Sequence, residues 1–119
     1  MNLGTQGESL VAQFIQKQGF TILERNYKKF YGEVDIIAKK EDLVIFVEVK
    51  TRTTHQYNLS EVITYGKQKK IIKAAQHYIA SKQLTNKVFR FDVALIQGAV
   101  NENSLQYIPN AFTKQERYG

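Results

Sequence analysis

The feature that most constrains the fold is a pair of neighbouring apolar segments, residues 33–39 and 43–50, both rich in Val, Ile and Phe. Runs of this kind favour β-strands, and residues 40–42 between them are expected to form the turn of a hairpin. Residues 43–47 are apolar without interruption, so both faces of this strand need a cover. The sequence therefore predicts a central strand pair inside a layered sheet.

Helical periodicity lies on both sides of this hairpin. Apolar residues recur at helical spacing over residues 5–18 and again over residues 64–82, which predicts two helices. Thr5 and Glu8 occupy the positions of a capping box at the start of the first helix, and Gly19 is a natural stop.

Shorter apolar runs predict three further strands, at residues 20–23, 89–96 and 105–108, the last of them ending at Pro109. The polar residues 51–60 read as a loop that orders on a ligand. The order helix, strands, helix, strands predicts one α/β domain over residues 1–119, with a central mixed sheet flanked by helices in three layers. The tail from about residue 110 is expected to be loose.

Composition excludes several classes of site. The 119 residues suffice for one domain, and they include no cysteine. This excludes a disulfide scaffold, a thiolate zinc site and a cysteine nucleophile, and it suits a reducing cytoplasm. The N-terminal residues show neither the basic nor the apolar region of a signal peptide, and no apolar run reaches the length of a membrane span. We therefore expect a cytoplasmic protein.

Positive charge is concentrated in one part of the chain. The net charge is +6, and residues 62–91 contain no Asp or Glu. Segregated positive charge favours a face that binds a polyanion such as nucleic acid over an ordinary basic surface. The basic residues of this stretch are Lys67, Lys69, Lys70, Lys73, Lys82, Lys87 and Arg90.

The two central strands each carry a carboxylate inside an apolar run. If the turn is centred between Glu41 and Asp42, paired residue numbers sum to 83, and Asp35 lies opposite Glu48. Facing carboxylates repel each other, and a divalent cation such as Mg²⁺ between them would convert that repulsion into coordination. A slip of one residue would instead place the two carboxylates on opposite faces.

Basic groups follow Glu48 on the same face of the strand. Lys50, two residues further, could orient a water molecule and offset charge on a phosphoryl group, and Arg52 could meet a flanking phosphate. The simpler alternative is a salt bridge between Glu48 and Lys50 on a half-exposed strand.

Other polar residues allow two interpretations each. Glu8 lies at the edge of the buried stripe of the first helix, as a third site carboxylate or only as part of the cap. Glu33 is either a supporting carboxylate behind the metal ligands or the solvated start of a strand. Gln68 lies on the apolar stripe of the second helix, where it could reach the site or a phosphate, or bond to a neighbouring backbone group. Asp92 is expected to pair with Arg90 or with a backbone amide.

A series of short motifs resembles a known family in order. The motifs are Gly4-x-x-Gly7-Glu8, Asn26-Tyr27, Gly32-Glu33-Val34-Asp35-Ile36-Ile37-Ala38, Val44-x-Phe46-Val47-Glu48-Val49-Lys50-Thr51-Arg52, Lys67-Gln68 and Arg90-Phe91-Asp92-Val93. They are similar to the small bacterial YraN-like proteins, which are described as predicted endonucleases. Those in turn resemble archaeal Holliday junction resolvases and the PD-(D/E)xK nucleases, which share a restriction-endonuclease-like fold.

The resemblance implies roles for individual residues. It implies Glu8, Asp35 and Glu48 as acidic site residues that hold Mg²⁺ or Mn²⁺, and Lys50 as the site lysine. Val34 stands where the superfamily motif has proline, a position that varies and does not bear on metal binding.

These patterns together predict a metal-dependent endonuclease that acts on DNA, including branched or damaged DNA. The expected DNA contacts are Arg52, Lys67, Gln68, Lys69, Lys70 and Lys73, and a homodimer would suit an enzyme that cuts two strands. Two alternatives stay open: a nucleic-acid-binding module that keeps the fold without cleaving, and a small interaction protein whose basic face meets an acidic protein.

Overall fold

The computed structural model describes residues 2–52 and 62–114. In chain order the elements are α1 (Leu3–Lys17), β1 (Thr21–Lys29), β2 (Gly32–Lys40), β3 (Leu43–Arg52), α3 (Tyr65–Ser81), β4 (Val88–Gln97), the short 3₁₀ helix η1 (Glu102–Ser104) and β5 (Leu105–Phe112). The five strands form one sheet in the order β1-β2-β3-β4-β5. Neighbouring strands are antiparallel except for β3 and β4, which are parallel.

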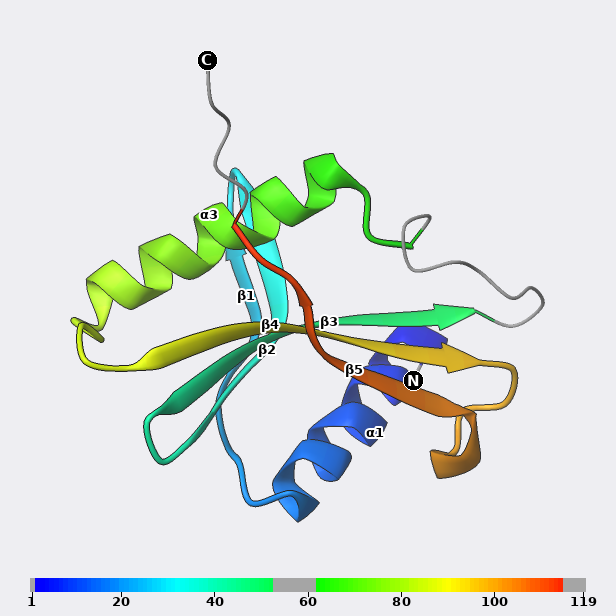
Figure 1. The fold of residues 1–119 in the computed structure, drawn as a ribbon. Coiled ribbons are helices and arrows are strands. Elements are labelled where there is room, and N and C mark those ends of the chain that lie inside the picture. Colours follow the sequence, from blue (N-terminus) through cyan, green and yellow to red (C-terminus); the bar gives the residue numbers. More distant parts are fainter. Residues whose placement is uncertain (1, 53–61, 115–119) are drawn as a thin grey trace.

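The two helices cover opposite faces of this sheet, α3 on one side and α1 on the other (Figure 1). The three-layer α/β arrangement predicted from the sequence is therefore confirmed. No helix in the described ranges 2–52 and 62–114 is long and apolar enough to cross a membrane.

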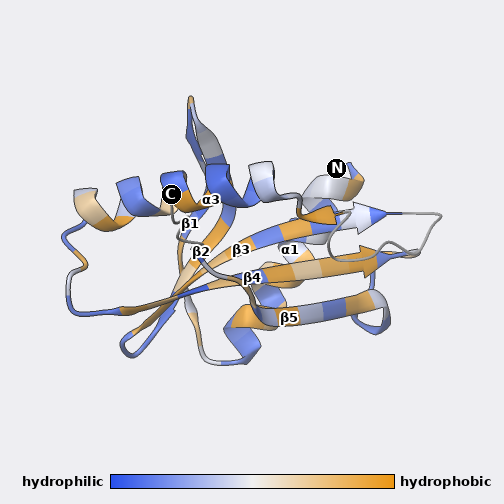
Figure 2. Ribbon diagram, turned by 45° about the horizontal axis from the view of Figure 1, so that its top comes forward, coloured by the Kyte–Doolittle hydropathy of each residue, from blue (hydrophilic) through white to orange (hydrophobic). Residues whose placement is uncertain are grey.

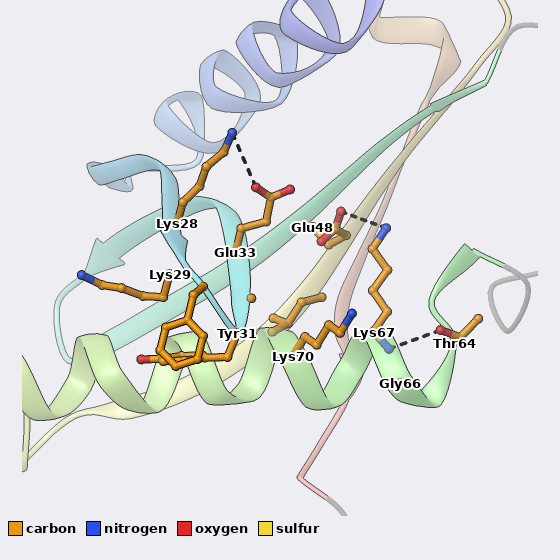
Figure 3. A pocket seen from close by; sticks show the side chains of 12 residues that line it. Lys28, Lys29, Tyr31, Glu33, Glu48, Thr64, Gly66, Lys67 and Lys70 are labelled. Carbon is orange, nitrogen blue, oxygen red and sulfur yellow. Dashed lines mark hydrogen bonds and ion pairs between the residues drawn. The ribbon is translucent and has the colours of Figure 1, made fainter.

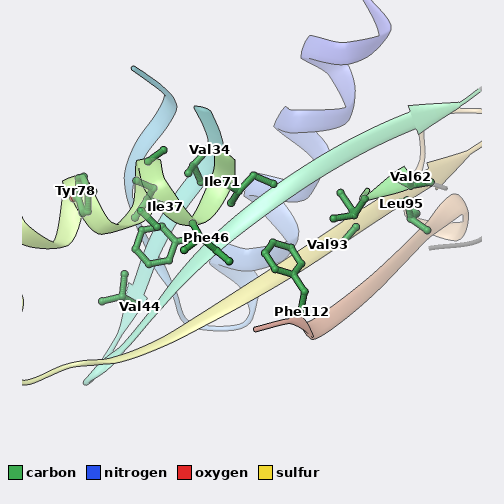
Figure 4. Packing of buried hydrophobic residues seen from close by; sticks show 14 residues of the cluster. Val34, Ile37, Val44, Phe46, Val62, Ile71, Tyr78, Val93, Leu95 and Phe112 are labelled. Carbon is green, nitrogen blue, oxygen red and sulfur yellow. The ribbon is translucent and has the colours of Figure 1, made fainter. Parts of the chain in front are cut away.

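Strand β3 supplies side chains to both cores, as its uninterrupted apolar run predicts. Val44 and Phe46 pack beneath α3 (Figure 4), whereas Ile45 and Val47 pack beneath α1. All four side chains are fully buried. Apolar segments, drawn in orange, run along much of the central strands β3 and β4 (Figure 2).

Helix α1 begins earlier than the sequence suggested. Its N-cap is Asn2, whose side-chain oxygen accepts a hydrogen bond from the backbone N–H of Thr5 at 2.8 Å. The predicted capping box of Thr5 and Glu8 is therefore wrong, because asparagine is an equally good N-cap and stands three residues upstream. Glu8 lies in the second turn and has no capping role. Gly19 follows the helix with φ +96°, as a glycine stop should.

Strand β5 continues past Pro109 to Phe112, so the prediction that the strand ends at the proline is wrong. Proline is tolerated here because β5 is an edge strand, and a register shift between Phe91 and Val93 adjusts the pairing. Phe112 is buried and stacks on Phe91 with ring centroids 5.1 Å apart. Residues 110–112 thus belong to β5 and not to a loose tail, and Ala111 and Phe112 pack in the core. Residues 115–119 lie outside the described part of the chain.

Two other expected boundaries also shift. β1 runs to Lys29, past the strand predicted at residues 20–23, and residues 51 and 52, expected in the loop, belong to β3. The rest of that predicted loop, residues 53–60, lies outside the described residues.

Candidate active site

The site is built where the β1–β2 hairpin bends away from the sheet. The ladder between β2 and β3 ends at the pair Ile36–Val47, and Asn26, opposite Asp35 in the hairpin, has φ +54°. Ile36 packs beneath α1 but Val34 packs beneath α3, so the direction of the side chains reverses between them. Beyond the bend the hairpin stands clear of the sheet and rises past α3 (Figures 1 and 2). Asp35 lies at the bend itself.

The predicted hairpin register is confirmed up to this bend. Residues 36–40 pair with residues 43–47, and each pair of numbers sums to 83. Asp35 and Glu48 would be the next pair, but the ladder does not extend to them, because the strands separate there. Instead, Oδ2 of Asp35 accepts a hydrogen bond from the backbone N–H of Val49 at 2.7 Å. The Asp35 carboxylate thus accepts a backbone N–H of β3 just beyond the point where the ladder between β2 and β3 ends.

The two carboxyl groups are nevertheless neighbours in a buried setting. Asp35 is 7% exposed and Glu48 is 6% exposed. Burial raises the pKa of Glu48 from its ordinary value of 4.5 to about 8, and the charge of Asp35 and a hydrogen bond with it act in the same direction. Removing an ionised carboxylate from water is costly, and a second carboxylate nearby adds to that cost. The pair therefore favours holding a proton or a cation.

Two lysines approach the same oxygen of Glu48. Nζ of Lys67 lies 3.5 Å and Nζ of Lys50 lies 3.8 Å from Oε1 of Glu48. Both ammonium groups lower the pKa of Glu48, but burial outweighs them. The pKa of Lys50 is itself lowered, first by burial and then by its neighbour Lys67. The predicted salt bridge between Glu48 and Lys50 is thus present, within a larger buried cluster.

The sequence did not predict the position of Lys67 in this cluster. Lys67 was expected to contact only DNA, yet it reaches Glu48 from the first turn of α3 (Figure 3). Thr64 caps this helix and accepts the backbone N–H of Lys67 at 3.2 Å, which fixes where the first turn begins. Side chains of a helix point back toward its N-terminus, and here that direction leads to β3. The motif Lys67-Gln68 was the one available signal.

A close approach of α1 to β3 brings in the third carboxylate. A Cβ atom on Gly7 would lie 2.2 Å from Oγ1 of Thr51, so only glycine allows this contact. Glu8 is the next residue, and its Oε1 lies 4.0 Å from Nη2 of Arg25. Burial and the charge of Asp35 raise its pKa. Glu8 therefore interacts with the buried pair electrostatically from the α1 side.

An open cleft of about 630 Å³ leads from solvent to Glu48. It lies between the tip of the β1–β2 hairpin and the first half of α3 (Figure 3). The two walls approach closely, since a Cβ atom on Gly32 would lie 2.3 Å from the backbone oxygen of Lys70. Lysines outnumber glutamates four to two among the lining residues, which are Lys28, Lys29, Phe30, Tyr31, Gly32, Glu33, Glu48, Thr64, Gly66, Lys67, Lys70 and Ile71.

The other predicted DNA-contact residues occupy different positions on α3. Lys70 lines the cleft, whereas Lys69 and Lys73 line a smaller pocket on another side of the helix. Gln68 donates from Nε2 to the backbone oxygen of Ile63 at 3.3 Å, the backbone bond that was one of its two interpretations. Arg52 donates to the backbone oxygen of Thr51 at 3.3 Å at the end of β3.

Glu33 and Asp92 lie apart from the buried pair. Glu33 lines the cleft, and its Oε2 lies 3.9 Å from Nζ of Lys28 across the hairpin. Asp92 accepts two hydrogen bonds from Arg90, at 2.8 and 3.0 Å, and one from the backbone N–H of Asn110 at 2.9 Å. Both partners predicted for Asp92 are thus confirmed. The basic and aromatic run at residues 28–31, for which the sequence predicted no role in the site, forms one wall of the cleft.

Two carboxylates can provide a binding place for a divalent cation here. Mg²⁺ in phosphate-handling sites is commonly held by one or two carboxylates together with water and substrate oxygens. Asp35 and Glu48 meet that requirement, because both carboxyl groups are buried and each lies within the electrostatic reach of the other. Within residues 2–52 and 62–114, no three His, Cys, Asp or Glu side chains are grouped closely enough to hold a metal. The role of Glu8 as a third ligand therefore stays a prediction.

Fold and site define an α/β protein in which a mixed five-stranded sheet lies between two helices and a cleft lined by four lysines reaches Glu48 of a buried acidic pair. The chain belongs to the uncharacterised protein family UPF0102, whose model matches residues 7–96. It is similar along nearly its whole length to several bacterial members of that family.

A UPF0102 protein of Alkaliphilus metalliredigens is 44% identical over 113 residues, covering 93% of this chain and 97% of the relative. One from Clostridium acetobutylicum is 46% identical over 112 residues, covering 92% of each chain. One from Clostridium botulinum is 47% identical over 115 residues, covering 93% of this chain and 94% of the relative.

Proposed function

We propose that this protein is a metal-dependent endonuclease that hydrolyses phosphodiester bonds in DNA. The observation that carries the proposal is the buried pair Asp35 and Glu48, flanked by Lys50 and Lys67, at the inner end of a basic cleft. The resemblance to YraN-like proteins, described as predicted endonucleases, supports the same reading.

Packing alone gives no reason for the acidic pair. Burying one carboxylate beside another costs stability, and an apolar pair at these positions would avoid that cost. Two ammonium groups within 3.8 Å of Glu48 do not bring its pKa back to the ordinary value. A divalent cation bound there together with an anionic substrate would offset that cost.

The residues of the site have separate roles in phosphodiester hydrolysis. Mg²⁺ or Mn²⁺ bound at Asp35 and Glu48 supplies polarisation of the phosphate and a bound water of lowered pKa. Lys50, whose own pKa is lowered, orients the attacking water and offsets negative charge on the phosphoryl oxygens. Lys67 and Lys70, at the positive end of α3, hold the backbone phosphates.

The non-cleaving nucleic-acid-binding module remains the second candidate. It is favoured by the two ammonium groups beside Glu48, which already bring positive charge to the site, and by the lack of a three-carboxylate group in the described ranges. Such a module would bind DNA through the same lysines without needing a metal.

Cleavage assays separate the two candidates. Branched, duplex and single-stranded DNA are incubated with the protein and Mg²⁺ or Mn²⁺. Asp35→Asn and Lys50→Ala are each expected to lose cleavage by about 10²-fold or more, as removal of a group that acts in the transition state does. Glu33→Gln, which removes a carboxylate from the outer cleft, is the matched control and should cleave like the parent. Lack of cleavage by the parent, or unchanged cleavage by both site variants, refutes the nuclease.

The proposal also includes a cytoplasmic location, where chromosomal DNA of a bacterium is accessible. A homodimer would place two clefts on two strands of a branched molecule. Sedimentation of the protein with and without junction DNA tests this, and a single monomeric species under both conditions would contradict it.

A further inference from the structure

Phe30, at the tip of the β1–β2 hairpin, is the most exposed large apolar side chain of the described residues. Its side chain is 100% exposed. With Tyr31 it forms the two-residue turn between Lys29 and Gly32. Two-residue hairpin turns favour Asn, Asp and Gly, so the formation of the turn does not require aromatic residues there. A fully exposed phenyl ring is little covered by the rest of the chain, so its faces are available to an external partner.

The neighbouring ring holds this turn in place. Tyr31 lies 6.2 Å from the ring of His77 on α3, and Phe30 meets Tyr31 edge-on at 4.8 Å. His77 in turn lies 2.6 Å from the hydroxyl of Tyr27 through Nδ1. Gly32 adds the backbone contact with α3 described above. The hairpin tip is therefore anchored on the helix, and Phe30 is presented to solvent from a fixed support.

Phe30 stands between two hollows that carry positive charge. On one side is the cleft that leads to Glu48, lined by Lys28, Lys29 and Lys70. On the other is a shallower hollow that Phe30 shares with Tyr31, Lys73, Gln76 and His77. An aromatic ring bordered by lysines is the combination with which proteins hold single-stranded nucleic acid, the ring stacking on a base and the cations following the phosphates.

We propose that Phe30 stacks on an unpaired base of the DNA whose backbone enters the cleft, so that the preferred substrate is DNA with an interrupted base stack, such as a gap, a flap or a junction. Stacking of one base on an aromatic side chain is worth about 5- to 150-fold in affinity. Opening an intact base step lowers the affinity by a comparable factor, so a single ring adds little to the affinity for continuous duplex. The ring therefore discriminates in favour of bases that are already unstacked.

This inference rests on the proposed function, because it assigns the substrate class of the same cleft, but binding tests it without cleavage. Fluorescence anisotropy measures the affinity for a labelled duplex that contains a short single-stranded gap and for the same duplex without the gap, both in EDTA. Phe30→Ala is expected to weaken gapped-DNA binding about 5- to 150-fold and duplex binding less than about twofold. Phe30→Trp should bind gapped DNA at least as well as the parent.

Three control variants and one fluorescent base separate stacking from other effects. Phe30→Leu keeps an apolar side chain without a π-face and should behave like Phe30→Ala. Val88→Ala truncates another exposed apolar residue, 64% exposed at the start of β4, and should bind like the parent. Lys70→Ala should reduce the slope of log affinity against log salt by about 1, whereas Phe30→Ala should leave that slope unchanged. 2-Aminopurine in the gap should change fluorescence on binding to the parent but not to Phe30→Ala.

The outcomes distinguish this inference from the proposed nuclease. The stacking role is overturned if Phe30→Ala binds gapped DNA like the parent, if it loses equal affinity for both DNAs, or if Phe30→Leu keeps the full affinity for gapped DNA. These outcomes include the case in which Phe30 contacts a protein. Phe30-dependent binding by a parent protein that cuts nothing with Mg²⁺ or Mn²⁺ overturns the nuclease and upholds the stacking. No binding of either DNA by the parent overturns both.

Discussion

Replacing Glu48 by glutamine removes the titrating proton of the cleft while preserving the shape of the side chain. The folded protein keeps Glu48 protonated up to about pH 8, whereas the unfolded chain releases this proton near the ordinary value of 4.5. The contribution of this group to stability is therefore fully present below pH 4.5 and is lost as the pH rises to 8. The stability of Glu48→Gln lacks this pH-dependent contribution, because glutamine does not titrate.

The size of the effect follows from the pKa. Each pKa unit corresponds to 1.36 kcal/mol, so a rise from 4.5 to about 8 is worth about 5 kcal/mol at most. Urea unfolding of metal-free parent and variant between pH 5 and pH 8 measures it as a difference. The variant should become more stable than the parent by an increasing margin as the pH rises, at up to about 1.4 kcal/mol per pH unit. Other titrating groups are shared and cancel to first order.

Added Mn²⁺ should reverse the comparison. It binds the ionised carboxylate, so it should stabilise the parent increasingly toward pH 8 and leave Glu48→Gln nearly unaffected. Glu33→Gln controls for the loss of one carboxylate from the cleft. A free-energy difference between parent and Glu48→Gln that stays constant from pH 5 to pH 8 would refute the buried, protonated Glu48. The same pH-dependent change in both variants would refute its assignment to this residue.

Three further substitutions test the packing that builds the site, each measured by denaturant unfolding. Gly7→Ala should cost about 1–3 kcal/mol, because its Cβ would lie 2.2 Å from Oγ1 of Thr51, and Thr51→Ala in the same chain should recover part of that loss. Gly32→Ala should also destabilise, since it meets a backbone oxygen at 2.3 Å; Gly66→Ala, with open space around it, should gain about 0.5–1 kcal/mol and is the control for both. Equal effects at all three glycines would contradict the close-approach argument. Asp92→Asn should cost about 3 kcal/mol or more, because a fully buried carboxylate that pairs with an arginine is lost, and a change below about 1 kcal/mol would contradict it.

Much of the fold could be predicted from the sequence because local patterns agreed with the final packing. The uninterrupted apolar run in β3 required cover on both faces, and two helices provide it. The turn between Glu41 and Asp42 set the register of residues 36–40 on 43–47, although no glycine marks it, because Glu41 itself adopts φ +54°. Two boundary predictions were wrong. Asn2 was not recognised as the N-cap of α1, and β5 was expected to end at Pro109 although an edge strand tolerates proline.

The candidate site was only partly predictable, because its geometry depends on a break in regular structure. Asp35 and Glu48 are neighbours, as expected, but through the bend at Asn26 and not as a rung of the ladder. Hydropathy patterns do not predict that an asparagine within a strand adopts the left-handed backbone conformation, as Asn26 does. Lys67 joins the site through the orientation of a whole helix, which depends on packing between elements far apart in the sequence.

The parallel pairing of β3 with β4 has a consequence for how the chain assembles. Every residue of β3 pairs with one 45 positions further along, from Leu43 with Val88 to Arg52 with Gln97. Hairpins of adjacent strands close small loops, whereas such a long-range pairing must first overcome a larger entropy of loop closure. The meander that carries Asp35 and Glu48 can therefore form before α3 docks. We expect the acidic pair to come together early in folding. Lys67 and Lys70 on α3, which complete the cleft, should take their positions only in the slower step that pairs β3 with β4.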